Sequence, residues 1–98
     1  MSYSNSGTVT LTADSAIGAS GKPVRIYSIY WVKGTGAETM IVRSGTSDSS
    51  AIIIEQVSTA DDGNILDFGT EGILFPKGAF WDEGTAFDSA TFTFTEEL

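Results

Sequence analysis

The side chains that most often carry out catalysis are missing from this sequence of 98 residues. It contains no histidine and no cysteine, so it cannot form a Ser-His or Cys-His nucleophile, and it lacks the commonest transition-metal ligands. None of its serines lies in a Gly-x-Ser-x-Gly segment, and its glycines form no phosphate-binding loop ahead of a helix. We therefore predict no enzymatic activity, no cofactor and no tightly bound metal.

Two groups of acidic residues are the remaining candidates for chemistry. Asp61, Asp62 and Asn64 could offer oxygen atoms to Ca²⁺, but their spacing does not match that of a calcium-binding loop. Asp82 and Glu83 could supply one carboxylate of a glycosidase pair, but nothing in the sequence places the second one nearby. We interpret both groups as polar turns.

The charge balance and the apolar runs limit the possible partners. The chain has 13 acidic and 5 basic residues, for a net charge of −8. A nucleic-acid backbone requires clustered lysine and arginine, which here are scattered along the chain, so we expect no nucleic-acid partner. No unbroken apolar run is longer than four residues, the length of residues 51–54, which is far too short to span a membrane.

The first seven residues differ from the rest of the chain. Residues 1–7 are mostly small and polar, without the basic region and apolar stretch of a signal peptide. We interpret residues 1–7 as a flexible or partner-docked N-terminal arm, and residues 8–98 as one domain.

The strongest strand signal lies at residues 23–33, the densest run of β-branched and aromatic residues. Because side chains alternate between faces along a strand, Val24, Ile26, Ser28, Tyr30 and Val32 should share one face. The opposite face should carry Arg25, Tyr27, Ile29, Trp31 and Lys33. Both faces are apolar in the middle, which predicts a central strand whose second face is also covered.

The rest of the chain alternates short apolar segments with turn signals about every ten residues. We expect further strands at residues 8–13, 38–43, 51–57, 65–68, 73–75, 79–81 and 86–95, and a loop at 14–21. Seven or eight short strands without an amphipathic helix predict an all-β fold, a single antiparallel β-sandwich of which the jelly roll is one form.

Two threonine stripes have the cleanest period-two pattern in the chain. They comprise Thr8, Thr10 and Thr12 near the start of the chain, and Thr91, Thr93 and Thr95 near its end. Their neighbours Val9, Leu11, Phe92 and Phe94 would point into the core. We expect both stripes to face outward on neighbouring strands of one sheet, where threonine pairs stabilise the sheet.

The aromatic residues allow two interpretations. Large aromatic side chains dominate sandwich cores, and this explains most of them. The alternative is an interface or a sugar-binding platform, since one apolar row of the central strand needs an external cover. The partner-contact candidates are Tyr27, Ile29 and Trp31 on the predicted outer row, and Phe80 and Trp81 beside a turn.

Several segments resemble small all-β virion proteins of tailed bacteriophages, especially marine ones. They are residues 21–29, 41–45 and 63–68, followed by Glu-Gly-Ile-Leu-Phe-Pro-Lys-Gly at 71–78. In such proteins an acidic-Gly-Ile-x-Phe-Pro-x-Gly segment precedes the last hairpin. The resemblance spans most of the chain and carries no catalytic or ligand residue.

The resemblance implies a non-enzymatic structural protein of the virion, such as a capsid decoration (cement) protein. The implied partners are the major capsid protein or another virion protein, and further copies of the chain, with a trimer favoured because it matches the three-fold positions of capsids. The implied location is the capsid surface, after synthesis in the host cytoplasm. The alternative is a carbohydrate- or host-surface-binding module of a phage tail or fibre, with Trp31 or Trp81 as the stacking platform.

Overall fold

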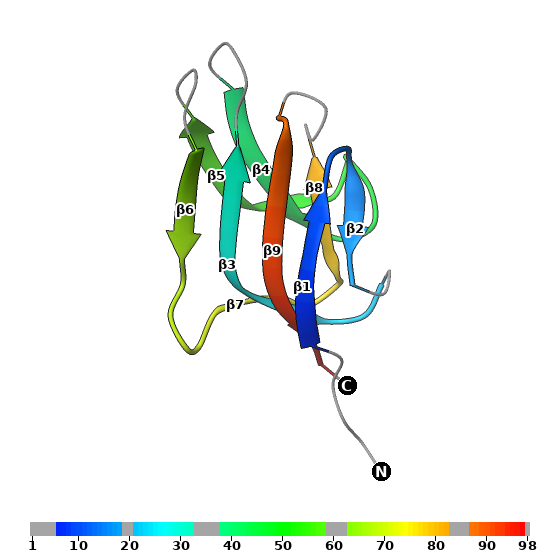
Figure 1. Ribbon diagram of the computed structural model, residues 1–98. Helices are drawn as coiled ribbons and strands as arrows, with labels where there is room; N and C mark the ends of the chain where they lie inside the picture. Colours follow the sequence, from blue (N-terminus) through cyan, green and yellow to red (C-terminus); the bar gives the residue numbers. More distant parts are fainter. Residues whose placement is uncertain (1–5, 19–20, 33–37, 59–62, 83–86, 98) are drawn as a thin grey trace.

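The computed structural model describes residues 6–18, 21–32, 38–58, 63–82 and 87–97. Within these ranges the chain forms nine β-strands in two sheets and no helix (Figure 1). No helix able to cross a membrane is found there. The expected all-β sandwich is confirmed.

The five-stranded sheet has the order β1-β9-β3-β6, and the short β7 pairs with β3 beside β6. All its pairs are antiparallel. Its strands are β1 (Ser6–Leu11), β3 (Val24–Val32), β6 (Gly63–Asp67), β7 (Ile73–Phe75) and β9 (Ser89–Glu96).

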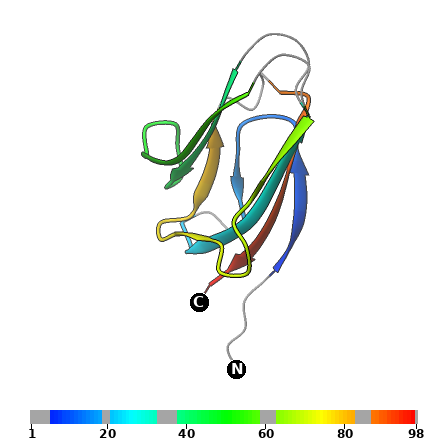
Figure 2. The same ribbon diagram turned by 90° about the vertical axis from the view of Figure 1, so that its left-hand side faces the viewer.

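The four-stranded sheet has the order β2-β8-β4-β5 and is also antiparallel. Its strands are β2 (Ser15–Ile17), β4 (Glu38–Ser44), β5 (Ala51–Ser58) and β8 (Ala79–Asp82). It packs behind the five-stranded sheet, and Figure 2 shows the two layers from the side. With β7 as a short addition, this strand order is that of a jelly roll, in which the first and last strands are neighbours.

Most strand boundaries differ from the expected ones by one to three residues, and two differences change the sheets. The predicted loop at 14–21 contains β2, a three-residue strand that pairs with β8 and buries Ile17 opposite Ala79. The strand is too short for its pattern to stand out in the sequence. In addition, β1 begins at Ser6, so the last two residues of the predicted arm belong to the sheet, while residues 1–5 lie outside the described part.

The core fills the space between the two sheets. Trp31 and Phe92 reach it from one sheet, Trp81 from the other, and all three are buried. The ring centroids of Trp81 and Phe92 lie 5.6 Å apart at an interplanar angle of 65°, the edge-to-face arrangement that aromatic pairs favour. Phe87 contributes a second, tilted contact with Trp81 at 6.0 Å.

The face assignment of β3 was correct for its first half and wrong for its second half. Val24 and Ile26 are fully buried, as predicted, but the pairing with β9 shifts by one residue between Ile26 and Ser28. This β-bulge places one extra residue in β3, so every later side chain exchanges faces. After the bulge, the residues that point into the core are therefore Ile29 and Trp31. Tyr30 was predicted to be buried but is exposed, and Val32 lies on the same outer face as Tyr30.

The arrangement of the threonine stripes is confirmed for the threonines of β1 and β9, while Thr12 lies just beyond the end of β1. β1 and β9 are neighbours, with Thr8 opposite Thr93 and Thr10 opposite Thr91. The hydroxyl oxygens of Thr10 and Thr91 lie 2.9 Å apart and share a hydrogen bond. Between these threonines, Phe92 is fully buried, as the alternating pattern required.

Candidate interaction surface

The five predicted partner-contact residues do not lie on one surface. Ile29, Trp31 and Trp81 are buried within the single chain and are not available to a partner, so the predicted outward placement of Ile29 and Trp31 is wrong and Trp81 is not a partner contact. The bulge explains the first two, and Trp81 points inward opposite Val42. Phe80 and Tyr27 are half-buried on the outer faces of the two sheets.

Three large apolar side chains are exposed on the outer face of the five-stranded sheet, and two more, Ile52 and Ile53, are exposed on β5 of the other sheet. Tyr30 is 49% exposed and lies directly opposite Ile65, which is 56% exposed, on the neighbouring β6. Side chains paired in this way lie about 5 Å apart at Cβ and shield each other only partly. Leu74 on β7, opposite Arg25, is exposed as well. We call Tyr27, Tyr30, Ile65 and Leu74 the apolar strip.

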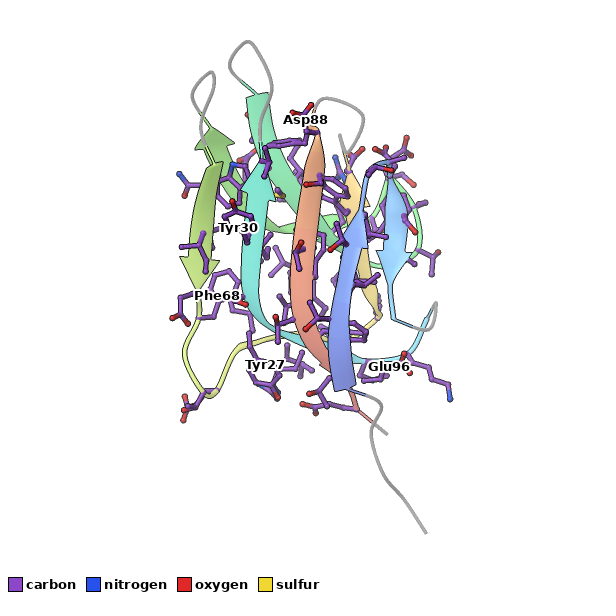
Figure 3. All side chains as sticks on the ribbon, in the orientation of Figure 1. Tyr27, Tyr30, Phe68, Asp88 and Glu96 are labelled. Atoms are coloured by element: carbon purple, nitrogen blue, oxygen red, sulfur yellow. The ribbon has the colours of Figure 1, made fainter. Side chains whose placement is uncertain are left out.

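The strip follows β3 and its neighbours β6 and β7. Figure 3 shows Tyr27 near the lower end of β3, Phe68 at the lower end of β6, and Tyr30 further up β3. Phe68 itself is partly buried against the core. On the other side of β3, β9 and β1 carry the threonine stripes. The outer face is therefore divided between an apolar half and a hydroxyl-rich half.

The β-bulge and Gly72 position Tyr27. At this point the neighbour of β3 changes from β7 to β6, and the amide of Phe68 donates a hydrogen bond to the carbonyl oxygen of Tyr27 at 2.8 Å. Gly72 has a φ of +65°, and a Cβ there would lie 2.7 Å from the Ile26 carbonyl oxygen and 2.9 Å from Cδ1 of Tyr27. Only glycine fits both the backbone and this close approach.

The positive charge next to the strip is already compensated. Arg25 forms an ion pair with Glu97 and donates from Nη1 to the carbonyl oxygen of Glu71 at 2.9 Å. The hydrogen bond to Glu97 raises the pKa of Arg25 above its ordinary value, so its guanidinium stays charged. Arg25 is therefore not an uncompensated cation for an anionic ligand.

The outer face of the four-stranded sheet is organised around an ion pair. Arg43 on β4 donates from Nε to Asp82 on β8 at 2.8 Å, and from Nη1 to the carbonyl oxygen of Ser50 at 2.8 Å. The side chain of Asp82 is only 8% exposed. Asp82 therefore has a structural partner, which leaves it poorly placed as a glycosidase acid, and its predicted neighbour Glu83 lies outside the described residues.

An open pocket of about 590 Å³ lies at one end of the sandwich, lined among others by Ser44, Ile53 and Lys77. One of its polar groups already has a partner in the chain: the hydroxyl of Ser44 accepts a hydrogen bond from the amide of Lys77 at 3.2 Å. Across the described ranges, no three His, Cys, Asp or Glu side chains are grouped to hold a metal ion. Asp61 and Asp62 are not among the residues that the structure describes.

No protein-family model matches the chain, and no curated protein or solved structure matches it either.

The exposed residues of the strip, Tyr30, Ile65 and Leu74, were not recognised from the sequence. One signal could have revealed Tyr30. Ser28, a polar residue, falls in the row assigned to the core, and such a defect in an apolar row indicates a bulge.

Proposed function

We propose that this chain is a non-enzymatic structural protein of a bacteriophage particle, and that it decorates the capsid by docking through the apolar strip. In this function Tyr30 and Ile65 lie against the capsid shell, and the threonine-bearing half of the sheet lies beside the contact. Many copies on a symmetric lattice multiply a modest contact into stable attachment.

The observation that carries the proposal is the exposure of Tyr30 and Ile65 as a cross-strand pair on a sheet face. Single exposed apolar residues are ordinary, but several on adjacent strands mark an interaction site. Covering a large apolar side chain contributes roughly 1.5–3 kcal/mol. A flat sheet face suits contact with another protein surface better than it suits enclosure of a small molecule.

Two further observations support the virion context. The jelly roll is a fold that viral capsid proteins use, which is an analogy at the level of fold. In addition, the phage-like segment at 71–78 forms β7 and its two flanking turns, where Gly72 and Gly78 have positive φ. The resemblance thus falls on residues that position Leu74, a member of the strip.

A carbohydrate- or host-surface-binding module is the second candidate, and one observation favours it. Tyr30 is an exposed aromatic ring, and next to it the threonine hydroxyls of β9 and β1, starting with Thr91 opposite Tyr30, could donate and accept hydrogen bonds. Jelly rolls also occur in lectins. The predicted platforms Trp31 and Trp81 are buried, so this candidate rests on Tyr30 instead.

The test is to locate the chain on purified particles of the phage that encodes it. Antibody labelling seen by electron microscopy should place many copies on the head, and mild stripping should release them without opening the shell. Absence from the particle would refute the proposal. Labelling confined to the tail or fibres, together with glycan binding that Tyr30→Ala abolishes, would establish the second candidate instead.

A further inference from the structure

We propose that a second copy of this chain pairs with the free edge of β1, strand β1 against strand β1, so that the five-stranded sheet continues antiparallel through two chains. This pairing does not depend on the proposed function. It uses a different surface from the apolar strip, because β1 lies at the opposite edge of the sheet from β6 (Figure 1).

The terminal strands of the two sheets differ in how well they resist pairing with another chain. Short length, charges and bulges all protect an edge strand. β2 and β7 have only three residues each, β6 ends at Asp67, and β5 carries the exposed Glu55 and a bulge at Ile53. β1 has six residues, pairs with β9 without interruption, and contains no charge, proline or bulge.

The edge of β1 is also open within the described part of the chain. β9 is the one described strand that pairs with β1, and β2, which follows it, pairs with β8 instead. An antiparallel strand leaves alternate N–H and C=O groups pointing away from its neighbour, ready for another strand. In a chain of net charge −8, an uncharged edge is the place where two copies meet with the least local repulsion.

The sequence of β1 matches itself when it runs antiparallel. With Val9 opposite Val9 of a second copy, Thr8 faces Thr10 and Gly7 faces Leu11. Threonines then meet threonines on the outer face, as Thr10 already meets Thr91 within the chain. If the register shifted by one residue, a threonine that points outward would lie opposite Val9, which points inward, and one sheet would have to be turned over relative to the other. The register between the two copies must therefore keep threonine opposite threonine.

Two details favour this register over one centred on Thr8. Val9 and Leu11 are only partly buried in the single chain, and the proposed register covers both. The space beside Gly7 is open, since a Cβ built there would have no atom within 4 Å. The side chain of Leu11 from a second copy can therefore occupy it, in a two-fold symmetric interface.

Single cysteines test the register directly, because the chain has no cysteine of its own. In Val9→Cys, the two introduced thiols of a pair lie opposite each other within the range of a disulfide. Under mild oxidation this variant should form a disulfide-linked dimer many times faster than Thr70→Cys, a control in an exposed turn. Thr8→Cys should be slow, because its partner position is Thr10. Equal rates for all three variants would overturn the proposal.

Charges on the exposed threonines test the pairing without altering the core. Thr8→Lys with Thr10→Lys sets lysine against lysine twice and should give a monomer in sedimentation velocity. Thr8→Lys with Thr10→Glu pairs opposite charges and should restore the dimer. Thr91→Lys with Thr93→Lys adds the same charge on β9, which is not at the edge of the sheet, and should leave the dimer intact. A wild-type chain that stays monomeric at high concentration, or a dimer unaffected by the first variant, would refute the proposal.

Discussion

Ile26 and Ile29 lie three residues apart in one β-strand, and both are fully buried in the same core. A regular strand would direct them to opposite faces. They share a face because the β-bulge places Tyr27 and Ser28 together on the outer side. The bulge thereby fixes which side chains of β3 reach the core and which ones a partner can contact.

The first prediction concerns the buried half of β3. Trp31→Ala combined with Ile29→Ser should remove most or all of the stability of the fold. Truncating a buried tryptophan costs roughly 3–5 kcal/mol, and losing a buried isoleucine adds a comparable amount, against a typical total stability of about 5–15 kcal/mol. Circular dichroism and chemical denaturation provide the measurement. A double mutant as stable as the wild type would contradict the assigned core.

The second prediction concerns the exposed half of the same strand. Tyr30→Ser combined with Ile65→Thr should leave the fold intact and change the free energy of unfolding by no more than about 1 kcal/mol, since each substitution lies on the surface. Urea denaturation of the variant and the wild type measures this difference. A loss comparable to that of the Trp31 variant would mean that the strip belongs to the core.

The sequence alone predicts which side chains of β1 and β9 are buried, but it does not predict this for the second half of β3. The threonine stripes and the buried Phe92 were predictable because β1 and β9 follow period two without a break. The faces of β3 were not, because a single bulge reverses every assignment after it. Tyr30 was missed for the same reason, whereas Ile65 and Leu74 depend on a strand order that joins distant parts of the chain.

The third prediction concerns the turn that holds Tyr27. Gly72→Ala should destabilise the fold by roughly 3 kcal/mol, because it combines a strained positive φ with a clash against the carbonyl oxygen of Ile26. Gly69→Ala is the matched control: it has a similar φ of +75° but open space, so it should cost only about 1 kcal/mol. Equal losses of unfolding free energy for the two variants would show that the close approach of residue 72 to the Ile26 carbonyl oxygen does not affect stability.

The fourth prediction concerns the ion pair on the four-stranded sheet. Asp82→Asn should cost about 2 kcal/mol, because it leaves the largely buried guanidinium of Arg43 without its carboxylate. The hydrogen bond that Arg43 donates to the carbonyl oxygen of Ser50 limits this loss of stability. Glu97→Gln removes the partner of Arg25 in a more exposed pair and should cost less stability than Asp82→Asn does. Thermal unfolding of both variants in the same buffer compares them, and the reverse order would contradict this account.

The most direct test of the proposed docking is to add the purified chain back to phage particles from which it has been stripped or deleted. Wild-type chain should co-sediment with the particles and saturate at a fixed number of copies. The folded Tyr30→Ser, Ile65→Thr variant should lose most of that binding, whereas a matched change among the threonines of β9, Thr91→Ser with Thr93→Ser, should retain it. Undiminished binding of the strip variant, or no saturable binding of the wild type, would contradict the claim that the apolar strip attaches this protein to a capsid.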